Sequence, residues 1–406
     1  MSQIDNSLEN FGYARVLVLT ESTKSGRKSL AQPSKKVEEA FLPKVPEGAA
    51  MSMVENGKQP QPYHYFPRLG LYVGYVDKNG LKKCQEVAAG VHAEEFISPI
   101  RPVAKRVAMS AGDVTWGLER LGISDIWKSG QRGKGVRVGH LDTGLDARHE
   151  ALRGRVKSFI ETELDGSIRV DTRLPEDKAH DTDEHGTHTA GTICGGFANS
   201  MAIGVAPECE LFSGLVIEGG DVLVRVLNGM EWCLENEVRV LSMSLGVRGF
   251  NPFWLDVTRR LRENNVLPAF AIGNEGVGTS RSPGNYAEAL SVGAMDSNDH
   301  VATFSSSIKF DRPTEPFQPN CVAPGVNVIS AKPGGGVQAM DGTSMATPHV
   351  AGVAALLIGS EPDATVDDIE KAILKSCTSL NGVPGIRQGA GLVNPSGALN
   401  ELRNIH

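Results

Sequence analysis

The stretch GTSMATPHVAG, residues 342–352, places a serine immediately before a run of small and aliphatic residues that favours a helix. Ser344 follows Gly342 and Thr343, so its hydroxyl is predicted at a helix N-terminus, where backbone N–H groups favour developing negative charge. Serine alone is a weak nucleophile. A catalytic interpretation therefore requires an imidazole that takes its proton and a carboxylate that orients the imidazole.

Upstream of this stretch, short apolar runs alternate with runs of helical periodicity. Strands are predicted at residues 135–141, 211–217, 238–245, 266–272 and 290–294, and helices at 186–195, 221–235 and 253–263; a further helix is predicted downstream, at 366–375. This alternation predicts a three-layer α/β fold, with a mostly parallel sheet covered by helices. In such folds, functional sites form at the carboxyl ends of the strands.

Three polar residues stand where this rule expects a site. Asp142 follows the predicted strand 135–141, His185 opens the glycine-containing motif HGTHTAGT, and Asn274 follows the strand 266–272 in AIGNEG. The carboxylate and the imidazole are the partners that Ser344 requires. The carboxamide of Asn274 could donate a hydrogen bond to the oxyanion of a tetrahedral intermediate.

The motif HGTHTAGT also contains His188, so a zinc site with two imidazoles three residues apart is an alternative. The chain has no glutamate in an HExxH arrangement here and no clear third ligand. We expect no metal at this motif and a structural role for His188.

Five motifs together resemble the subtilisin-like serine proteases. They are DTGLD (142–146), HGTHTAGT (185–192), SMSLG (242–246), GNEG (273–276) and GTSMATPHVAG (342–352), in that family's order of Asp, His and Ser. The resemblance covers roughly residues 113–400. It implies that Asp142 supports the imidazole, that His185 is the general base and then the general acid, and that Ser344 is acylated. Asn274 and the backbone N–H of Ser344 would bind the oxyanion.

The same resemblance implies a substrate-binding edge and a specificity pocket. Ser244, Leu245 and Gly246 would pair with the substrate backbone as an added β-strand. The first pocket would favour apolar side chains before the cut; its lining residues would be Leu245, Gly246, Ala271 and Gly273. Ile272 is bulkier than the small residue common in the family, which leaves the depth of this pocket open.

Many members of the family bind calcium near the histidine helix. Here the corresponding places carry Ala151 and the sequence Gly196-Phe197-Ala198-Asn199, which offer little carboxylate ligation. We expect no cofactor and no calcium at this loop. Calcium held elsewhere by backbone carbonyls stays open, because carbonyl ligands are invisible in a sequence.

Residues 1–107 form a predicted front domain, followed by a peptidase domain at 108–406. Strands at 15–20, 49–54 and 71–76, helices at 35–41 and 81–89 and an extended run at 96–103 give a β-α-β-β-α-β order. This small α+β, ferredoxin-like pattern resembles in outline the propeptides of the family. The resemblance implies an intramolecular inhibitor that blocks the active site with its last strand.

Charge is unevenly divided between the two parts. Residues 1–107 carry 15 Lys+Arg and 11 Asp+Glu, a net charge of +4. Because the whole chain has a net charge of −7, the remainder carries −11. Opposite charges favour an attraction between the two parts. The junction RPVAKRVAMSAG (101–112) has the composition of a linker or of a cleavage site, and both interpretations stay open.

Composition limits the remaining classes of function. A net charge of −7 argues against nucleic-acid binding, and no run of about 18 apolar residues suggests a membrane span. The amino terminus lacks the features of a signal peptide. Six scattered cysteines indicate free thiols in a reducing compartment, so we expect a cytoplasmic protein.

The favoured hypothesis is a latent endopeptidase that acts on intracellular proteins or peptides through an acyl-enzyme. A peptide-maturation protease or macrocyclase-like transpeptidase, in which an amine resolves the acyl-enzyme, is the first alternative. A catalytically inactive peptide-binding protein is the second. It is disfavoured because Asp142, His185, Asn274 and Ser344 are all present.

Overall fold

The computed structural model describes residues 3–20, 30–50, 61–94, 97–107, 112–163, 168–173, 175–217, 221–313 and 315–405. Its largest sheet has eight strands in the order β20-β17-β15-β13-β7-β12-β8-β9. All neighbouring pairs are parallel except the antiparallel pair β8 and β9. In chain order, these strands are β7 (Arg137–Asp142), β8 (Val156–Thr162), β9 (Ile168–Thr172), β12 (Glu210–Leu215), β13 (Val240–Met243), β15 (Leu267–Ala271), β17 (Leu290–Met295) and β20 (Cys321–Pro324).

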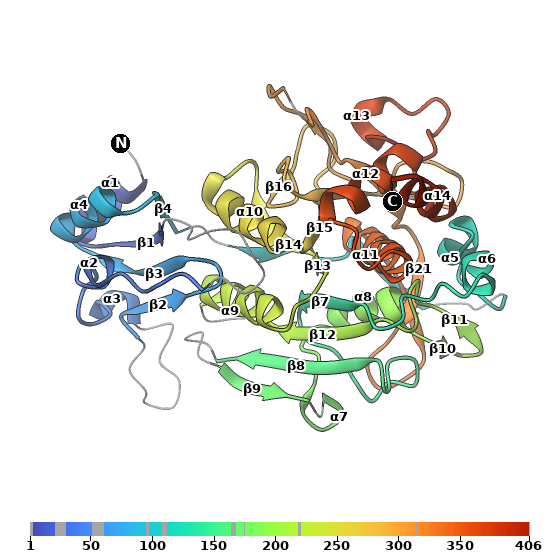
Figure 1. The fold of residues 1–406 in the computed structure, drawn as a ribbon, viewed down its shortest axis with the longest axis horizontal. Coiled ribbons are helices and arrows are strands. Elements are labelled where there is room, and N and C mark those ends of the chain that lie inside the picture. The colour runs from blue at the N-terminus through green and yellow to red at the C-terminus, as the bar shows by residue number, and fades with distance from the viewer. Residues whose placement is uncertain are drawn as a thin grey trace.

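Helices cover both faces of this sheet (Figure 1). The helices α8 (His185–Cys194) and α11 (Thr343–Ser360) share one hydrophobic core, and α9 (Val222–Glu235) and α10 (Leu255–Glu263) share the other. Along β13, Val240 contributes to the first core and Leu241 to the second, as the two-residue period of a strand requires. The predicted three-layer α/β architecture with a mostly parallel sheet is confirmed.

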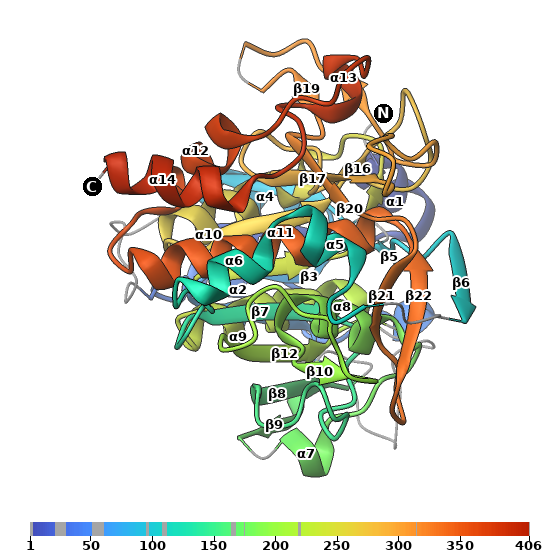
Figure 2. The same ribbon diagram turned by 90° about the vertical axis from the view of Figure 1, so that its right-hand side faces the viewer.

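The central helix α11 explains why residues 342–352 dominate the sequence pattern. All its residues through Ile358 are buried, and it carries no charged side chain. A helix that is apolar on all sides is stable only inside a large core. It begins at Thr343, and Figure 2 shows it beside the strands of the large sheet, which it contacts.

The N-terminal unit contains a four-stranded antiparallel sheet in the order β2-β3-β1-β4. Val16 and Val18 face one core, with the helices of this unit, whereas Leu17 and Leu19 face the core of α9 and α10. Both faces of β1 are therefore apolar and buried. The elements of this unit are α1 (Gln3–Phe11), β1 (Ala14–Leu19), α2 (Lys35–Glu38), α3 (Glu47–Ala50), β2 (Tyr63–Phe66), β3 (Leu71–Val76), α4 (Lys78–Val87) and β4 (Gly90–Ala93).

Three sequence predictions need correction. Residues 49 and 50 belong to the helix α3, consistent with the high helix propensity of alanine, and residues 51–54 of that predicted strand lie outside the described residues. The fourth strand of the front sheet is β4 rather than the run 96–103, because Val16 to Leu19 pair with residues 90–93. The predicted strand 238–245 divides at Ser244, where the chain leaves the large sheet and enters β14 (Leu245–Arg248).

Charged groups hold the N-terminal unit against α9. Arg15 forms ion pairs with Glu94 of its own unit and with Asp221, which caps α9. Glu231 on α9 accepts hydrogen bonds from the backbone N–H groups of Arg68 (2.8 Å) and Leu69 (3.0 Å). Burial raises the pKa of Glu231 to about 6, although these N–H groups act in the opposite direction. Because this folded-state pKa exceeds the ordinary value of 4.5, the linked stability is present below pH 4.5 and is lost as the pH rises through about 6.

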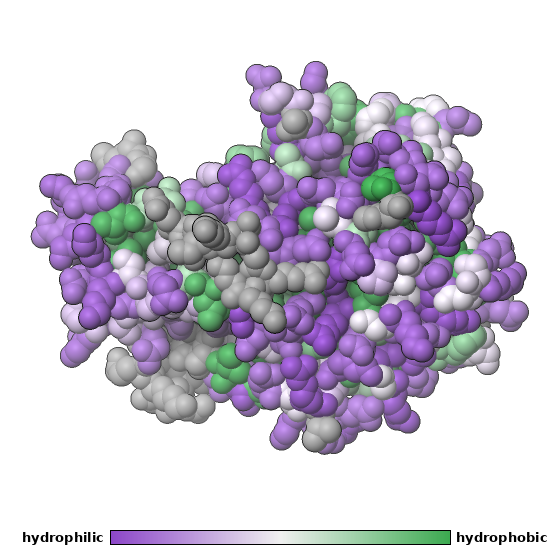
Figure 3. Space-filling view, in the orientation of Figure 1, coloured by the Kyte–Doolittle hydropathy of each residue, from purple (hydrophilic) through white to green (hydrophobic). Residues whose placement is uncertain are grey.

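Hydrophilic side chains cover most of the described surface on the face shown in Figure 3, with small apolar patches between them. Among the described residues, no helix is long and apolar enough to cross a membrane. The six cysteines are free thiols, and all except Cys377 are buried.

We expect Glu231→Ala to loosen the N-terminal unit without unfolding the large sheet. The substitution leaves two backbone donors without their charged acceptor, at a cost of about 1.5–3 kcal/mol. Hydrogen exchange followed by mass spectrometry should therefore be roughly ten- to a hundredfold faster in β2 and β3, with α11 unchanged. Glu235→Ala, at an exposed position on the same helix, is the matched control. Equal exchange in both variants would contradict this account of the interface.

Candidate active site

The site forms where β7 ends and α8 begins. Asp142 is the last residue of β7 and His185 is the first of α8, and the imidazole Nδ1 lies 2.6 Å from the carboxylate Oδ1. Two glycines permit this approach, because a Cβ at Gly186 would lie 1.9 Å from the carbonyl oxygen of Gly144. The two motifs thus pack backbone against backbone, which holds the carboxylate and the imidazole together.

Asp142 is buried but well supplied with hydrogen bonds. Its Oδ1 also accepts from the backbone N–H of Thr143 (2.7 Å), and its Oδ2 accepts from the hydroxyl of Thr189 (3.3 Å). Burial acts to raise the pKa of Asp142, but His185, His140 and the backbone N–H of Thr143 outweigh it and lower the pKa. The carboxylate is therefore ionised at neutral pH, and it fixes the imidazole with Nδ1 protonated.

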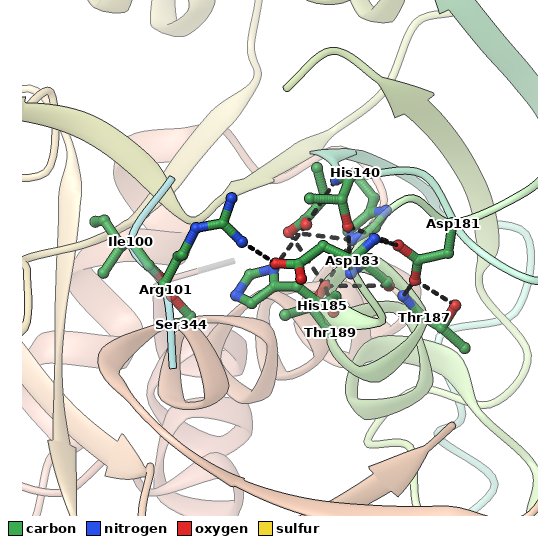
Figure 4. A network of polar contacts seen from close by, with 12 residues as sticks. Ile100, Arg101, His140, Asp181, Asp183, His185, Thr187, Thr189 and Ser344 are labelled. Atoms are coloured by element: carbon green, nitrogen blue, oxygen red, sulfur yellow. Dashed lines mark hydrogen bonds and ion pairs between the residues drawn. The ribbon is translucent and has the colours of Figure 1, made fainter. Parts of the chain in front are cut away.

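Burial likewise acts to lower the pKa of His185, but the charge and hydrogen bond of Asp142 oppose it. Asp181 and Asp183 add to that effect, and the net result is a raised pKa. Among the described residues, the other ring nitrogen, Nε2, has no hydrogen-bond partner. In Figure 4 the free edge of this ring faces the side on which Ser344 and Ile100 lie.

A second histidine, His140, contacts the Asp142 carboxylate through the hydroxyl of Thr189. His140 Nε2 lies 2.8 Å from the hydroxyl of Thr189 and 3.8 Å from Asp142 Oδ2, and its Nδ1 lies 2.9 Å from the hydroxyl of Ser213 (Figure 4). Burial lowers the pKa of His140, with Asp142 and Asp181 opposing and His185 adding to the effect. A neutral His140 can donate to Thr189, which leaves the threonine proton free to point at Asp142.

Asn274 lies beside the N-terminus of α11. Its Oδ1 accepts from the backbone N–H (2.9 Å) and from the hydroxyl (2.8 Å) of Thr343, so the side-chain amide is oriented with its Nδ2 toward the cleft. Ser344, the second residue of this helix, is fully buried. A hydroxyl and an amide donor therefore stand together at one helix N-terminus.

Residues 97–107 run through this cleft. The strand β5 (Ser98–Pro99) pairs antiparallel with Leu245 and Gly246 of β14, and the backbone N–H of Ile100 donates to the carbonyl of Ser244 (2.9 Å). Further along, β6 (Ala104–Val107) pairs with β22 (Val337–Asp341). The segment lies as an added strand on both sides of Ser344.

Two successive carbonyls of the segment meet the polar groups of the site. The hydroxyl of Ser344 donates to the carbonyl oxygen of Ile100 (2.5 Å), whereas Asn274 Nδ2 donates to that of Arg101 (2.9 Å). The two polar groups therefore contact the carbonyls of adjacent residues rather than the same carbonyl.

Basic side chains of the segment contact acidic groups around the cleft. Arg101 forms an ion pair with Asp183 next to His185, and Lys105 Nζ lies 3.7 Å from the same carboxylate and 3.8 Å from that of Glu184. Arg106 pairs with Asp341. The uneven charge of the sequence is thus concentrated where the segment crosses the site.

The expected pocket residues lie around the strand that β5 joins. Ala271 is the last residue of β15. Gly273 lies two residues further along the chain and immediately before Asn274, and Leu245 and Gly246 belong to β14. A Cβ on Gly273 would lie 2.7 Å from Glu275 Oε2 and 3.2 Å from Arg281 Cγ. The ion pair of Glu275 and Arg281 therefore borders the predicted first pocket, which the sequence suggested was apolar.

The groups considered for metal binding have other contacts. His188 Nε2 lies 2.9 Å from the carbonyl oxygen of Val328, and burial lowers the pKa of this histidine to about 3. Ala151 and Ala198 lie in a buried cluster with Met201 and Ile203. These side chains do not fit calcium, which takes oxygen ligands. Among the described residues, no group of three or more His, Cys, Asp or Glu side chains could hold a metal ion.

Sequence reasoning missed His140, Glu275 and Arg281. His140 lies in the predicted strand 135–141 (GVRVGHL), where a histidine two residues before Asp142 was a usable signal of a second polar partner. Glu275 directly follows Asn274 in GNEG. Nothing in the sequence indicates Arg281, because it reaches the site only through the pairing of β16 (Arg281–Ser282) with β14.

Comparisons with known proteins agree on one family. The model of the subtilase family matches residues 133–392. The chain is 32% identical over 308 residues to an intracellular serine protease of Paenibacillus polymyxa, covering 72% of this chain and 88% of that protein. It is 34% identical over 293 residues to subtilisin Savinase of Lederbergia lenta, covering 71% of this chain and 99% of that protein. It is also 32% identical over 331 residues to subtilisin E of Bacillus subtilis (strain 168), covering 80% and 79%.

We expect Asp183→Asn to lower the pKa of His185, because it removes one of the charges that favour the imidazolium. A folded-state pKa above the ordinary value of 6.5 gives stability below that pH, which is lost as the pH rises through the folded value. The variant should lose this stability at a lower pH than the parent. NMR titration of the imidazole measures the shift. Asp299→Asn, which removes a carboxylate paired with Arg120, is the control, and equal pKa values in the two variants would contradict the assignment.

Proposed function

The chain belongs to the subtilase family of serine endopeptidases, and we propose that Asp142, His185 and Ser344 form its catalytic triad. The observation that carries this proposal is the buried hydrogen bond between Asp142 and His185, with a chain segment seated on Ser344. A polypeptide is the substrate of such an enzyme. We further propose that the N-terminal unit keeps the protein latent as a zymogen.

In the proposed mechanism, His185 Nε2 takes the proton of the Ser344 hydroxyl as the oxygen attacks the scissile carbonyl carbon. Asp142 holds Nδ1–H and stabilises the imidazolium that forms. The imidazolium then protonates the leaving amine, which departs and leaves an acyl group on Ser344. Water, deprotonated by His185, attacks this ester, and the serine leaves as the carboxylic acid product is released.

The oxyanion of each tetrahedral intermediate would be bound by Asn274 Nδ2 and the backbone N–H of Ser344. Support for this role comes from the contact of Nδ2 with a carbonyl oxygen in the cleft and from the fixed orientation of the amide. In a subtilisin, loss of one such donor costs about 3 kcal/mol of transition-state stabilisation. Donors that are already oriented require no reorganisation during the reaction.

We propose that substrates bind as the segment 97–100 does, by adding a strand to β14 along Ser244, Leu245 and Gly246. Main-chain hydrogen bonds of this kind accept many sequences. Ile100 occupies the position of the residue before the cut and is 1% exposed. Its burial supports a preference for an apolar side chain there.

Latency follows from the same segment. The hydroxyl of Ser344 donates to the carbonyl oxygen of Ile100, and Asn274 Nδ2 donates to that of Arg101. The proposed nucleophile and the proposed oxyanion donor therefore contact different carbonyls. Arg101 also precedes Pro102, whose ring restricts the preceding residue. We infer that the N-terminal unit inhibits by occupying the cleft in a register that is poorly cut.

We also propose that the enzyme acts in the cytoplasm. Its six cysteines are free, as expected in a reducing compartment. The relative from Paenibacillus polymyxa carries the description intracellular. Restraint by an attached inhibitor suits a protease that shares a compartment with its host's own proteins.

We expect the protein to react with a fluorophosphonate probe at Ser344, because only an activated serine is phosphonylated rapidly. The Ser344→Ala variant should show no labelling at this position, and His185→Ala should label at a rate lower by about a thousandfold or more, given that triad residues act as a unit. In-gel fluorescence and peptide mapping measure both. Equal labelling of the parent and of Ser344→Ala would exclude this nucleophile. A parent that stays unreactive even after the chain has been cut between Arg101 and Ala111 would favour a binding protein.

We expect self-processing to cut the chain between about Arg101 and Ala111, of which residues 108–111 lie outside the described residues. Mass spectrometry should find a shortened parent and an intact Ser344→Ala variant. Pro102→Ala should accelerate self-processing, because it relieves the restriction on Arg101 and lets the segment change its register in the site. Identical intact masses in parent and Ser344→Ala would reject self-processing.

A further inference from the structure

Arg281 lies beside the strand that the N-terminal segment joins. It belongs to β16, which pairs with β14 on the side opposite β5, in the sheet order β16-β14-β5. Its side chain is nearly buried, and the residue is 6% exposed. A guanidinium cannot lose its charge in a protein and carries five N–H donors. Each donor that faces the cleft therefore needs an acceptor.

Most of this guanidinium is fixed by Glu275. Arg281 Nε lies 2.8 Å from Glu275 Oε1, and Nη2 forms an ion pair with the same oxygen. Burial acts to raise the pKa of Glu275, but Arg281 outweighs it and the pKa is lowered, so the carboxylate is ionised at neutral pH. Arg248 lies 3.6 Å from the same oxygen. Two cations and one carboxylate leave a net positive charge beside the cleft.

The remaining nitrogen, Nη1, faces the bound segment. It donates to the hydroxyl of Ser98 (2.8 Å) and, less closely, to the carbonyl oxygen of Gly246 (3.3 Å). If Ile100 holds the place of the residue before the cut, Ser98 holds that of the third residue before it. The inhibitory segment thus presents an oxygen acceptor to the one nitrogen of Arg281 that Glu275 does not engage.

We propose that Arg281 forms a substrate subsite that binds an oxygen-bearing side chain, hydroxyl or carboxylate, on the third residue before the cut. When the segment leaves, either a substrate or water must supply the hydrogen-bond acceptor that Ser98 provided to Arg281. A hydrogen bond to a charged donor is stronger than one between neutral groups. The net positive charge of the cluster extends the preference from serine and threonine to aspartate and glutamate, and it disfavours lysine.

This inference rests on the proposed function, and its first test uses quenched peptides with isoleucine before the cut. The third residue before the cut is serine, aspartate, alanine or lysine. After self-processing, we expect the protein to cleave the serine and aspartate peptides about three- to tenfold faster, as kcat/KM, than the alanine peptide, with lysine slowest. Arg281→Met should remove the difference, and Arg281→Lys should retain part of it.

The same preference in Arg281→Met, or no preference in the parent, would overturn the subsite. So would a preference for acidic residues directly before the cut, which would assign Arg281 to the first pocket instead. Cleavage of all peptides at equal rates refutes the subsite alone. Absence of both cleavage and fluorophosphonate labelling refutes the proposed function as well. Thermal unfolding of each variant checks that the fold is intact.

A second test needs no peptide and works even if the full chain stays latent. Ser98→Ala should speed fluorophosphonate labelling of Ser344 about three- to tenfold, because the inhibitory segment loses its bond to Arg281. In the Arg281→Met background, the same substitution should change the rate by less than about twofold, as a double-mutant cycle requires for a direct contact. An equal effect of Ser98→Ala in both backgrounds would overturn the proposed contact.

Discussion

The hydrogen bond between Asp142 and His185 is the interaction on which the site depends. It joins the end of the central strand β7 to the start of α8, so it couples the sheet to the helix layer that also contains α11. Its short length is set by two backbones that only glycine lets approach so closely. Because both side chains are buried, neither can exchange the other for water. The chemistry of the site is therefore fixed by packing as much as by charge.

Much of this arrangement could be predicted from the sequence. Asp142, His185, Asn274 and Ser344 each stand at the junction of a periodic segment and a glycine-containing turn, and the parallel sheet gathers such junctions at one edge. The alternation of strands and helices was also legible, because each buried strand is a short apolar run bounded by turns. The sequence pattern was sufficient where a short segment determines both its own secondary structure and the position of its functional residue.

Other features depend on contacts between distant segments, and the sequence could not specify them. Arg281 reaches the cleft only because β16 lies against β14, and His140 contributes only because Thr189 and Ser213 come to it from other elements. The offset between Ile100 and Arg101 is a matter of one residue in the register of the bound segment. The short strand β4 was missed for a related reason, since its weak local preference is decided by its pairing with β1.

The two-sided burial of β1 has a consequence for the proposed restraint of the enzyme by its N-terminal unit. Leu17 and Leu19 on one face of the small sheet, with Leu71 and Val73 of β3, are packed against the core of α9 and α10. Separation would bare these side chains to water, each at a cost of roughly 2 kcal/mol. A detached N-terminal unit would thus lose the apolar contacts on one face of its sheet and would become easier to digest. Activation would then be irreversible, because the detached N-terminal unit that inhibits the enzyme would be degraded.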